Sequence, residues 1–264
     1  MPITPSPGAA LAAMRAATPL VHNITNYVVM TPTANALIAA GASPAMIHAV
    51  EEAAEFAAIA SALVVNIGTL SPAWVDGMIG AARAAVAAGK PWILDPVGVG
   101  ATAYRRETVT ALIAEKPTVI RGNASEILAI AGLGGAGRGV DSTAAAGDAA
   151  EAAAALARAT GAVVVVSGAV DVATDGARTV RIANGVPLLA LTTGTGCTAT
   201  ALIGAFLGAG IAALPAAVCG MVLMGVAGEI AARGDPGPGT FAVRLLDALH
   251  AVTPAELDRL ARID

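Results

Sequence analysis

Residues 62–98 read ALVVNIGTLSPAWVDGMIGAARAAVAAGKPWILDPVG and place a longer segment between two short apolar ones. The short segments, 62–69 and 91–98, are apolar throughout and end in polar, glycine or proline residues, which is typical of buried strands. Between them, Ser71 and Pro72 suit the N-cap and first position of a helix over 71–89. Fully apolar strands joined by a helix predict a parallel sheet with helices on both faces.

The same alternation extends in both directions from this unit. Strands are predicted at 18–26, 43–48, 118–123 and 162–168, and helices at 31–42, 49–60, 105–115, 124–132, 143–161, 198–210, 214–233 and 239–252. Asp175 and Gly176 separate two short alternating stretches, which predicts a hairpin, and the residues just before 192 look strand-like. Residues 132–142 are glycine-rich and are interpreted as a flexible loop. Without a repeat or a long linker, residues 1–264 are expected to form one α/β domain.

The composition is unusually apolar, with 56% hydrophobic and 13% charged residues, whereas about a quarter are charged in ordinary soluble domains. Either a membrane protein or a soluble α/β protein that buries extra surface by oligomerising fits these values. No charge occurs between Arg181 and Glu229, but glycines and prolines cut this stretch below the ~20 residues of a spanning helix. Buried helices are therefore favoured over a membrane span. A net charge of −4 without a basic stripe argues against nucleic-acid binding.

The two cysteines, Cys197 and Cys219, have neither metal-site spacing nor the number for a disulfide framework, so a reducing cytoplasm is expected. No signal peptide is recognised at the N-terminus. Cys219 lies within a predicted helix and is expected to pack in the core. Cys197 leaves three interpretations open: a small buried residue, part of a membrane helix, or a reactive group at a helix N-terminus.

Ligands of doubly wound sheets bind beyond the carboxyl ends of the strands, so polar residues at those ends are the candidates for a site. Arg121 follows an apolar run, and a guanidinium there needs an anionic partner. Asp95 suits either a cation or a loop cap, and Glu126 suits either a function or a capping box with Asn123. The full set is His22, Asn23, Asn26, Asn66, Thr69, Asp95, Pro96, Arg121, Gly122, Asn123, Ser167, Gly168 and residues 192–195.

Residues 192–200, TTGTGCTAT, open the predicted helix at 198–210. Glycines let the backbone turn tightly, and successive N–H groups at a helix start attract anions. This predicts an anion site at Gly194, Thr195, Gly196 and Cys197 that suits a phosphoryl group. It also predicts a lowered pKa for the Cys197 thiol. The loop is not a Walker A motif, because no Gly-Lys-Ser/Thr follows.

Six motifs occur along the chain: HNITNYVVMTPTANALIAAGASPAM (22–46), NIGTL (66–70), DPVGVGAT (95–102), IRGNASEI (120–127), SGAVD (167–171) and TGTGCTAT (193–200). Together and in this order they resemble the hydroxyethylthiazole kinases, which belong to the ribokinase-like superfamily. The resemblance implies a three-layer ribokinase-like fold. It also implies transfer of the ATP γ-phosphate to 4-methyl-5-(2-hydroxyethyl)thiazole in thiamine salvage, a Mg²⁺ requirement, and a homotrimer with active sites between subunits.

The resemblance also assigns roles to individual residues. It implies substrate contacts at Met46, Gly194 and Asn23, nucleotide contacts at Arg121, Ser167, Asn123 and Gly168, and metal-associated carboxylates at Asp95 and Glu126. Cys197 stands where ribokinase-like relatives carry a catalytic aspartate, so it is expected to accept the alcohol proton or orient the hydroxyl. The alternatives are another small-molecule kinase of this superfamily, a nucleotide-dependent repair dehydratase, or a non-catalytic nucleotide-binding regulator.

Overall fold

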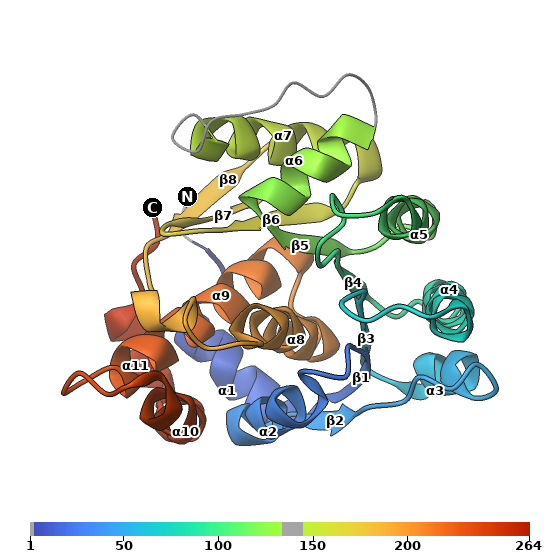
Figure 1. Ribbon diagram of the computed structural model, residues 1–264. Coiled ribbons are helices and arrows are strands. Elements are labelled where there is room, and N and C mark those ends of the chain that lie inside the picture. Colours follow the sequence, from blue (N-terminus) through green and yellow to red (C-terminus); the bar gives the residue numbers. More distant parts are fainter. Residues whose placement is uncertain (1–2, 134–144) are drawn as a thin grey trace.

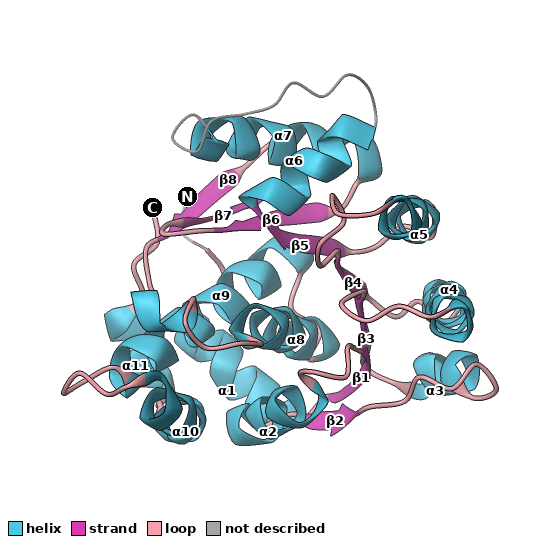
Figure 2. Ribbon diagram, in the orientation of Figure 1, coloured by secondary structure: helices cyan, strands magenta, loops and turns pink. Residues whose placement is uncertain are grey.

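The computed structural model describes residues 3–133 and 145–264 and shows one large sheet with helices on both faces (Figures 1 and 2). In the described residues the sheet has eight strands in the order β2-β1-β3-β4-β5-β6-β7-β8. Strands β1 to β6 are parallel, β7 runs antiparallel to β6, and β8 runs antiparallel to β7. The strands are β1 (Leu20–Ile24), β2 (Ser43–Ala45), β3 (Ala62–Asn66), β4 (Trp92–Asp95), β5 (Val119–Asn123), β6 (Val163–Ser167), β7 (Asp171–Thr174) and β8 (Thr179–Ile182).

The helices form one layer on each face of this sheet, as Figure 1 shows. One layer consists of α3 (Ala53–Ile59), α4 (Pro72–Ala87), α5 (Ala103–Ala114), α6 (Ala124–Leu133) and α7 (Ala145–Thr160). The other consists of α1 (Pro7–Ala17), α2 (Met30–Ala40), α8 (Thr195–Gly208), α9 (Ala213–Ala231), α10 (Pro238–Ala251) and α11 (Pro254–Leu260). The predicted α/β class, parallel strands and Asp175-Gly176 hairpin are confirmed.

Each strand contributes to both hydrophobic cores because successive side chains point to opposite faces. In β3, Val64 packs with the α8 and α9 layer, while Leu63 and Val65 pack with the α4 layer. A strand buried on both faces needs apolar residues at every position, which accounts for the continuous apolar runs in the sequence.

The long uncharged stretch forms α8 and α9 at the centre of one layer. A Cβ built on Gly204 of α8 would lie 2.7 Å from Val64 Cγ2, and one on Gly220 of α9 would lie 2.5 Å from Ile203 Cγ1. Glycines therefore let α8 pack closely on the sheet and α9 on α8. The 19-residue α9 is long and apolar enough to cross a membrane by composition, but 78% of its most apolar window is buried inside the protein. Its apolar character is thus used in the core.

The structure corrects the sequence analysis in two places. Helices α1 and α11 were not predicted, although Ser6 caps α1 and Thr253 forms a capping box with Glu256 at the start of α11. The strand-like residues before 192 form a 3₁₀ turn at Pro187–Leu189, because Pro187 and the following turn prevent sheet pairing. The glycine-rich stretch 132–142 lies outside the described residues from position 134 onward.

Candidate active site

The first turn of α8 lies at the carboxyl ends of the parallel strands and begins at Gly194. Gly194 has φ +84°, and a Cβ there would come 2.8 Å from Val29 Cγ1, so glycine is required for this turn. No side chain caps the helix, and the N–H groups of Thr195, Gly196 and Cys197 donate to no protein group in the described residues. Free N–H groups at a helix start form an anion-binding position.

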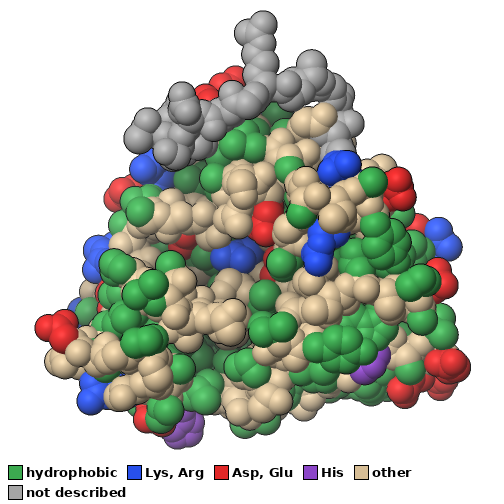
Figure 3. Space-filling view, viewed as in Figure 1, with side chains coloured by type: hydrophobic (Ala, Val, Ile, Leu, Met, Phe, Trp, Pro, Cys, Tyr) green, Lys and Arg blue, Asp and Glu red, His purple; other side chains and the backbone are tan. Residues whose placement is uncertain are grey.

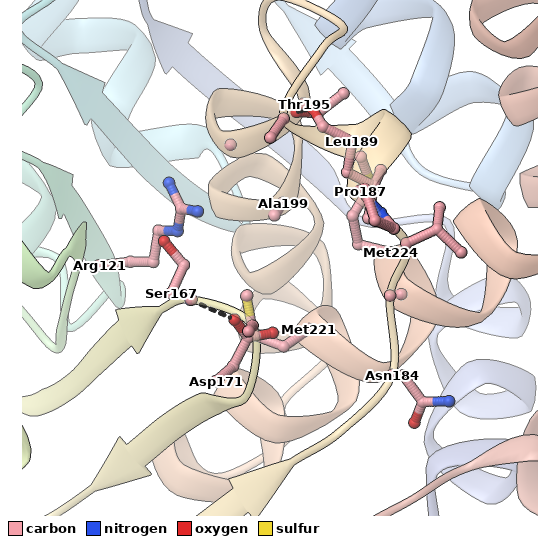
Figure 4. Close-up of a pocket in the computed structure, with 17 residues that line it drawn as sticks. Arg121, Ser167, Asp171, Asn184, Pro187, Leu189, Thr195, Ala199, Met221 and Met224 are labelled. Atoms are coloured by element: carbon pink, nitrogen blue, oxygen red, sulfur yellow. Dashed lines mark hydrogen bonds between the residues drawn. The ribbon is translucent and has the colours of Figure 1, made fainter. Parts of the chain in front are cut away.

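Arg121, in β5, extends its guanidinium toward this turn (Figure 4). The residue is only 9% exposed. It makes no salt bridge within the described part of the chain, and its Nε is a buried donor without a partner. A Cβ built on Gly196 would lie 2.8 Å from Arg121 Nη1, so the guanidinium lies directly against the backbone of α8. An unpaired buried cation is costly, which indicates that a bound anion completes this site.

A chain of polar side chains connects the ends of β1, β3 and β4 with α8. Asn26 Nδ2 donates to Asn66 Oδ1 at 2.9 Å, and Asn66 Nδ2 donates to Asp95 Oδ2 at 2.8 Å. Thr200 of α8 also donates to Asp95 Oδ2, at 2.8 Å, while Asn26 Nδ2 lies 3.6 Å from Cys197 Sγ. These contacts place the sulfur, the carboxylate and the start of α8 in one cluster.

Asp95 is the most deeply buried acid of this cluster, at 1% exposure. Burial raises the pKa of its carboxyl to about 6, although Arg121 and the hydrogen bonds from Thr200 and Asn66 lower it. Its Oδ1 is buried and has no hydrogen-bond partner among the described residues. One oxygen is thus held by the protein, while the other is a buried acceptor with unused capacity.

A cavity of about 560 Å³ adjoins the start of α8. One wall carries Arg121, Ser167 and Asp171 and the opposite wall carries Pro187, Leu189 and Met224 (Figure 4). In Figure 3, blue and red atoms of charged side chains gather near the centre of the same face, with green apolar areas beside them. The cavity therefore has one cationic end and one apolar end, and its volume suits a cofactor-sized ligand.

Comparison with known proteins identifies the family. Residues 11–255 match the hydroxyethylthiazole kinase family. The chain is 56% identical over 257 residues to the hydroxyethylthiazole kinase of Cereibacter sphaeroides (strain ATCC 17025 / ATH 2.4.3), covering 97% of this chain and 98% of that protein. It is 56% identical over 259 residues to the enzyme of that name from Rhizobium leguminosarum bv. trifolii, covering 98% and 97%. The chain belongs to the hydroxyethylthiazole kinase family.

Solved structures agree with this assignment. The structure of the hydroxyethylthiazole kinase protein from Pyrococcus horikoshii OT3 is 40% identical, covers 98% of both chains and superposes with a TM-score of 0.91. A pyridoxal kinase from Staphylococcus aureus in complex with AMP-PCP (17% identity, TM-score 0.60, 79% of this chain and 86% of that chain) shares the fold. So does a ribokinase-like superfamily protein from Enterococcus faecalis V583 (13%, TM-score 0.61, 89% and 88%). The predicted three-layer ribokinase-like fold is confirmed.

For this family member, one expectation about Cys197 is wrong. The position at the helix start was expected to lower the pKa of the thiol. Instead, burial and the nearby Asp95 carboxylate raise it to about 11, although Asn66, Arg121 and Asn26 act in the opposite direction. Desolvation and a buried negative charge thus outweigh the helix terminus. At neutral pH the thiol is protonated.

Glu126 and Asn123 form the capping box that was one of the two interpretations of this kinase-family motif. The Asn123 N–H donates to Glu126 Oε2 at 2.8 Å, and the Glu126 N–H donates to Asn123 Oδ1 at 3.0 Å. Glu126 Oε1 also accepts from the Gly98 N–H at 2.9 Å. The carboxylate therefore holds the loop after β4 against α6, and each of its oxygens keeps a second lone pair.

The remaining predicted residues lie at different depths of the site. Ser167 lines the cavity, and Gly168 lines it as well and donates its N–H to Asp171 Oδ1 at 2.9 Å. Met46 directly follows β2, is half-buried and lies outside the cavity lining. Asn23 is buried within β1 and donates to its own strand at Val21 O. The structure thus brings the nucleotide candidates Arg121, Ser167 and Gly168 together.

Sequence reasoning missed several residues of the site in this family member. Thr200 binds Asp95 from the second turn of α8, and Asn184, Met221 and Met224 line the cavity. Asp171 and Thr200 carried a signal, since they belong to the quoted motifs SGAVD and TGTGCTAT. The apolar lining residues could not be separated from core residues, because α9 is apolar all round.

Proposed function

We propose that this chain transfers the γ-phosphoryl group of ATP to the hydroxyl of 4-methyl-5-(2-hydroxyethyl)thiazole, as a single catalytic domain over residues 1–264. Family membership and the enzyme names of its relatives support this activity. The observation that carries the proposal is the buried Arg121 guanidinium, unpaired among the described residues and held against the uncapped start of α8. A cation and free N–H groups at one point are what a phosphoryl group in transfer requires.

Phosphoryl transfer depends mainly on positioning and charge neutralisation, so each residue has a limited task. Arg121 offsets the negative charge of the phosphates, while the N–H groups of Thr195, Gly196 and Cys197 bind the oxygens of the transferred group. Ser167 and Gly168 contact the nucleotide from the cavity wall, and Asn123 lies at the edge of this region. The cationic end of the cavity holds the phosphates and the apolar end holds the base.

Cys197 lies where the acceptor hydroxyl approaches the phosphate. Its protonated thiol orients this hydroxyl, and it does not act as a thiolate base at neutral pH, because its pKa is about 11. A loose transition state needs little base strength, so the alcohol proton can leave late.

The residues present fit Mg²⁺ in part. Asp95 offers an oxygen without a partner in the described residues, and Mg²⁺ is commonly held by one or two carboxylates together with substrate phosphates and water. Glu126 is the second candidate, although both of its oxygens already accept from backbone N–H groups. No group of three metal-binding side chains occurs in residues 3–133 and 145–264, so substrate phosphates and water would supply the other ligands. When bound, the ion supplies charge neutralisation at the phosphates.

The thiazole is proposed to bind on the side of α8 that faces the ends of β1 and β2. Met46 supplies a polarizable thioether for a flat, soft ring, and Gly194 lets the substrate approach the backbone. Asn23, buried in β1, is proposed as a further substrate contact. No cationic group for a phosphorylated acceptor was recognised in the sequence, which favours a neutral alcohol.

We also propose that the active enzyme is a homotrimer, located in the cytoplasm, whose subunits cover this region. Tyr27, Val28 and Leu191 are 68%, 61% and 69% exposed. The two segments that carry them meet where Val29 packs on Gly194. Exposed apolar side chains next to a site are typical of a surface that a partner covers. Leu191→Asp should lower the mass in light scattering, whereas Ile59→Asp, at an equally exposed position on α3, should not.

The deciding experiment is an ADP-release assay with the thiazole alcohol as acceptor, with and without Mg²⁺. Acceptor-dependent ADP formation and a phosphorylated thiazole are expected. Faster turnover with a pyrimidine alcohol or ribose would indicate another kinase of the superfamily. Release of inorganic phosphate without a phosphorylated product would indicate a dehydratase, and nucleotide binding without turnover would indicate a regulator.

A further inference from the structure

Asp171 is a buried acid that the proposed mechanism does not use. It begins β7 and lies beside the end of β6, since the neighbouring residues Val166 and Val172 are paired in the sheet. The side chain lines the cavity although the residue is only 7% exposed. Among the cavity-lining residues it is the one carboxylate, and it lies near the Arg121 guanidinium, to which it is electrostatically coupled.

The two oxygens of Asp171 are in different situations. Oδ1 accepts from the Gly168 N–H at 2.9 Å. Oδ2 has no hydrogen bond to the described residues, yet it is not among the fully buried polar atoms that lack a partner. Because the residue lines the cavity, this oxygen is reached from the cavity side.

Other polar side chains of the cavity are already engaged. Asn184 donates to Glu229 Oε1 and to the Leu260 carbonyl. Thr195 donates to backbone carbonyls of Leu189 and Thr192. Among the described side chains of the cavity, Arg121, Ser167 and Asp171 Oδ2 therefore keep capacity for a ligand, since the one hydrogen bond of Ser167 is a long contact of 3.4 Å to Gly122 O. They comprise a cation, a hydroxyl and an acceptor.

The position of Asp171 indicates which part of a ligand it meets. In Figure 4, Ser167 lies between Arg121 and Asp171 on one wall, and Met221 lies beside Asp171. Asp171 thus stands between the cationic end and the apolar side chains. A carboxylate repels phosphates, so it needs a donor from the ligand. In a nucleotide, the part between the phosphates and the base is the sugar, whose hydroxyls are donors.

We propose that Asp171 accepts a hydrogen bond from a ribose hydroxyl of the bound nucleotide and so selects ribonucleotides. This inference rests on the proposed nucleotide site. Carboxylates recognise ribose hydroxyls in other nucleotide-binding folds by the same chemistry. Asp171 is accordingly a specificity-determining residue for the nucleotide, and the transferred phosphate does not contact it.

Calorimetric titration of the full chain with ADP, 2′-deoxy-ADP and 3′-deoxy-ADP tests this directly, without the thiazole. The wild type should bind ADP about tenfold more tightly than at least one deoxynucleotide, the effect of a hydrogen bond to a charged group. In Asp171→Asn, which keeps an acceptor for the Gly168 N–H, and in Asp171→Ala, most of this preference should disappear. Ser167→Ala should weaken the binding of all three nucleotides equally.

Equal affinity of the wild type for the three nucleotides would overturn the inference, even if the variants did not fold. An equal loss of affinity for all three nucleotides in Asp171→Asn would also overturn the inference, because a residue with a purely structural role has that effect. Titration with inosine diphosphate, which lacks the 6-amino group of ADP, adds a further test. If the wild type prefers ADP over inosine diphosphate and Asp171→Asn does not, Asp171 would be assigned to the base instead of the sugar. A wild type that shows the sugar preference but does not phosphorylate the thiazole would refute the proposed acceptor alone.

Discussion

The guanidinium of Arg121 rests on Gly196, where a Cβ would come within 2.8 Å of Nη1 and 3.3 Å of Nη2. Gly196→Ala should therefore push the guanidinium away from the free N–H groups of α8. Because the atoms in conflict are the end of a flexible side chain, stability should change by less than about 1 kcal/mol. The KM for ATP should rise about tenfold or more, since a charge-assisted contact is lost. Steady-state kinetics and thermal unfolding measure the two effects.

Gly147→Ala is the matched control for this substitution. Gly147 is also helical, but nothing lies within 4 Å of the point in α7 that its Cβ would occupy. Alanine there should leave the KM unchanged and stabilise the helix by up to about 1 kcal/mol. An unchanged KM in Gly196→Ala would show that Arg121 does not need its present position to bind ATP.

Cys197→Ser should retain turnover within about tenfold of the wild type, because a protonated thiol and a hydroxyl orient an alcohol in similar ways. Alkylation of Cys197 by iodoacetamide should be slow at pH 8 and accelerate toward pH 11, following the raised pKa of the thiol. Mass spectrometry distinguishes this site from Cys219, which is fully buried and has a pKa of about 12.

A thousandfold loss in Cys197→Ser, or rapid alkylation at pH 7, would instead establish a reactive thiolate. Cys197→Asp tests the analogy with aspartate-containing relatives. It should support measurable turnover, since the carboxylate occupies the same place beside the acceptor. If it folds and is completely inactive, that analogy is wrong.

Asp171→Asn should make the protein more stable at pH 8. Burial raises the pKa of Asp171 from 3.8 to about 6, although the Gly168 N–H and Arg121 lower it. The folded state thus holds the proton more tightly than the unfolded chain, and the ionised carboxylate destabilises the fold above pH 6. Asparagine removes this cost, so the free energy of unfolding should rise by about 1–3 kcal/mol at pH 8. This gain should decline to nothing below about pH 4. Urea denaturation at both pH values measures it.

Asp175→Asn should change the stability at pH 8 in the opposite direction to Asp171→Asn. Hydrogen bonds, first from the Arg178 N–H and also from the Ala177 N–H, lower the pKa of the exposed Asp175. Its ionised form therefore stabilises the hairpin above the ordinary pKa of 3.8, and this contribution is lost as the pH falls. The variant should be less stable than the wild type at pH 8. If the stability of both variants changed with pH in the same direction, the pKa shift assigned to Asp171 or the one assigned to Asp175 would be wrong.

Glu229→Gln should weaken nucleotide binding without affecting the chemical step. Glu229 Oε1 accepts from the Gly185 N–H at 2.8 Å and from Asn184 Nδ2 at 3.1 Å, and Arg262 pairs with the same carboxylate. Asn184 and Gly185 line the cavity, so this pairing holds one of its walls in place. The KM for ATP should rise several-fold, while kcat should stay within about twofold.

Arg83→Ala is the control for this prediction, because it breaks the exposed Arg83–Glu115 pair on the opposite helix layer. It should change neither KM nor kcat. A fall in kcat with an unchanged KM in Glu229→Gln would show that the carboxylate acts on catalysis and not on the wall of the cavity.

Local patterns predicted the elements whose signals are contained in a few residues. Ser71 and Pro72 start α4, Gly41 ends α2 with φ +105°, and Asp175-Gly176 turns the hairpin. Capping residues were also present in front of α1 and α11, but no long periodic pattern of apolar residues followed them. Those helices pack on each other, as the hydrogen bond from the Gly8 N–H to Asp258 Oδ1 shows, and no local pattern records a contact across 250 residues.

The sequence by itself determined the α/β class, five parallel strand ends that carry polar residues, and the family through its ordered motifs. These features depend on local backbone preference and on which side chains are apolar. Only the tertiary structure decided the state of Cys197: the helix start alone lowers a thiol pKa, whereas Asp95 and burial, supplied by distant β4 and the surrounding core, raise it. It also decided that Arg121 meets Gly196 and that Asp171 faces the cavity. Electrostatic energies depend on distances and desolvation, and both exist only after the chain has folded.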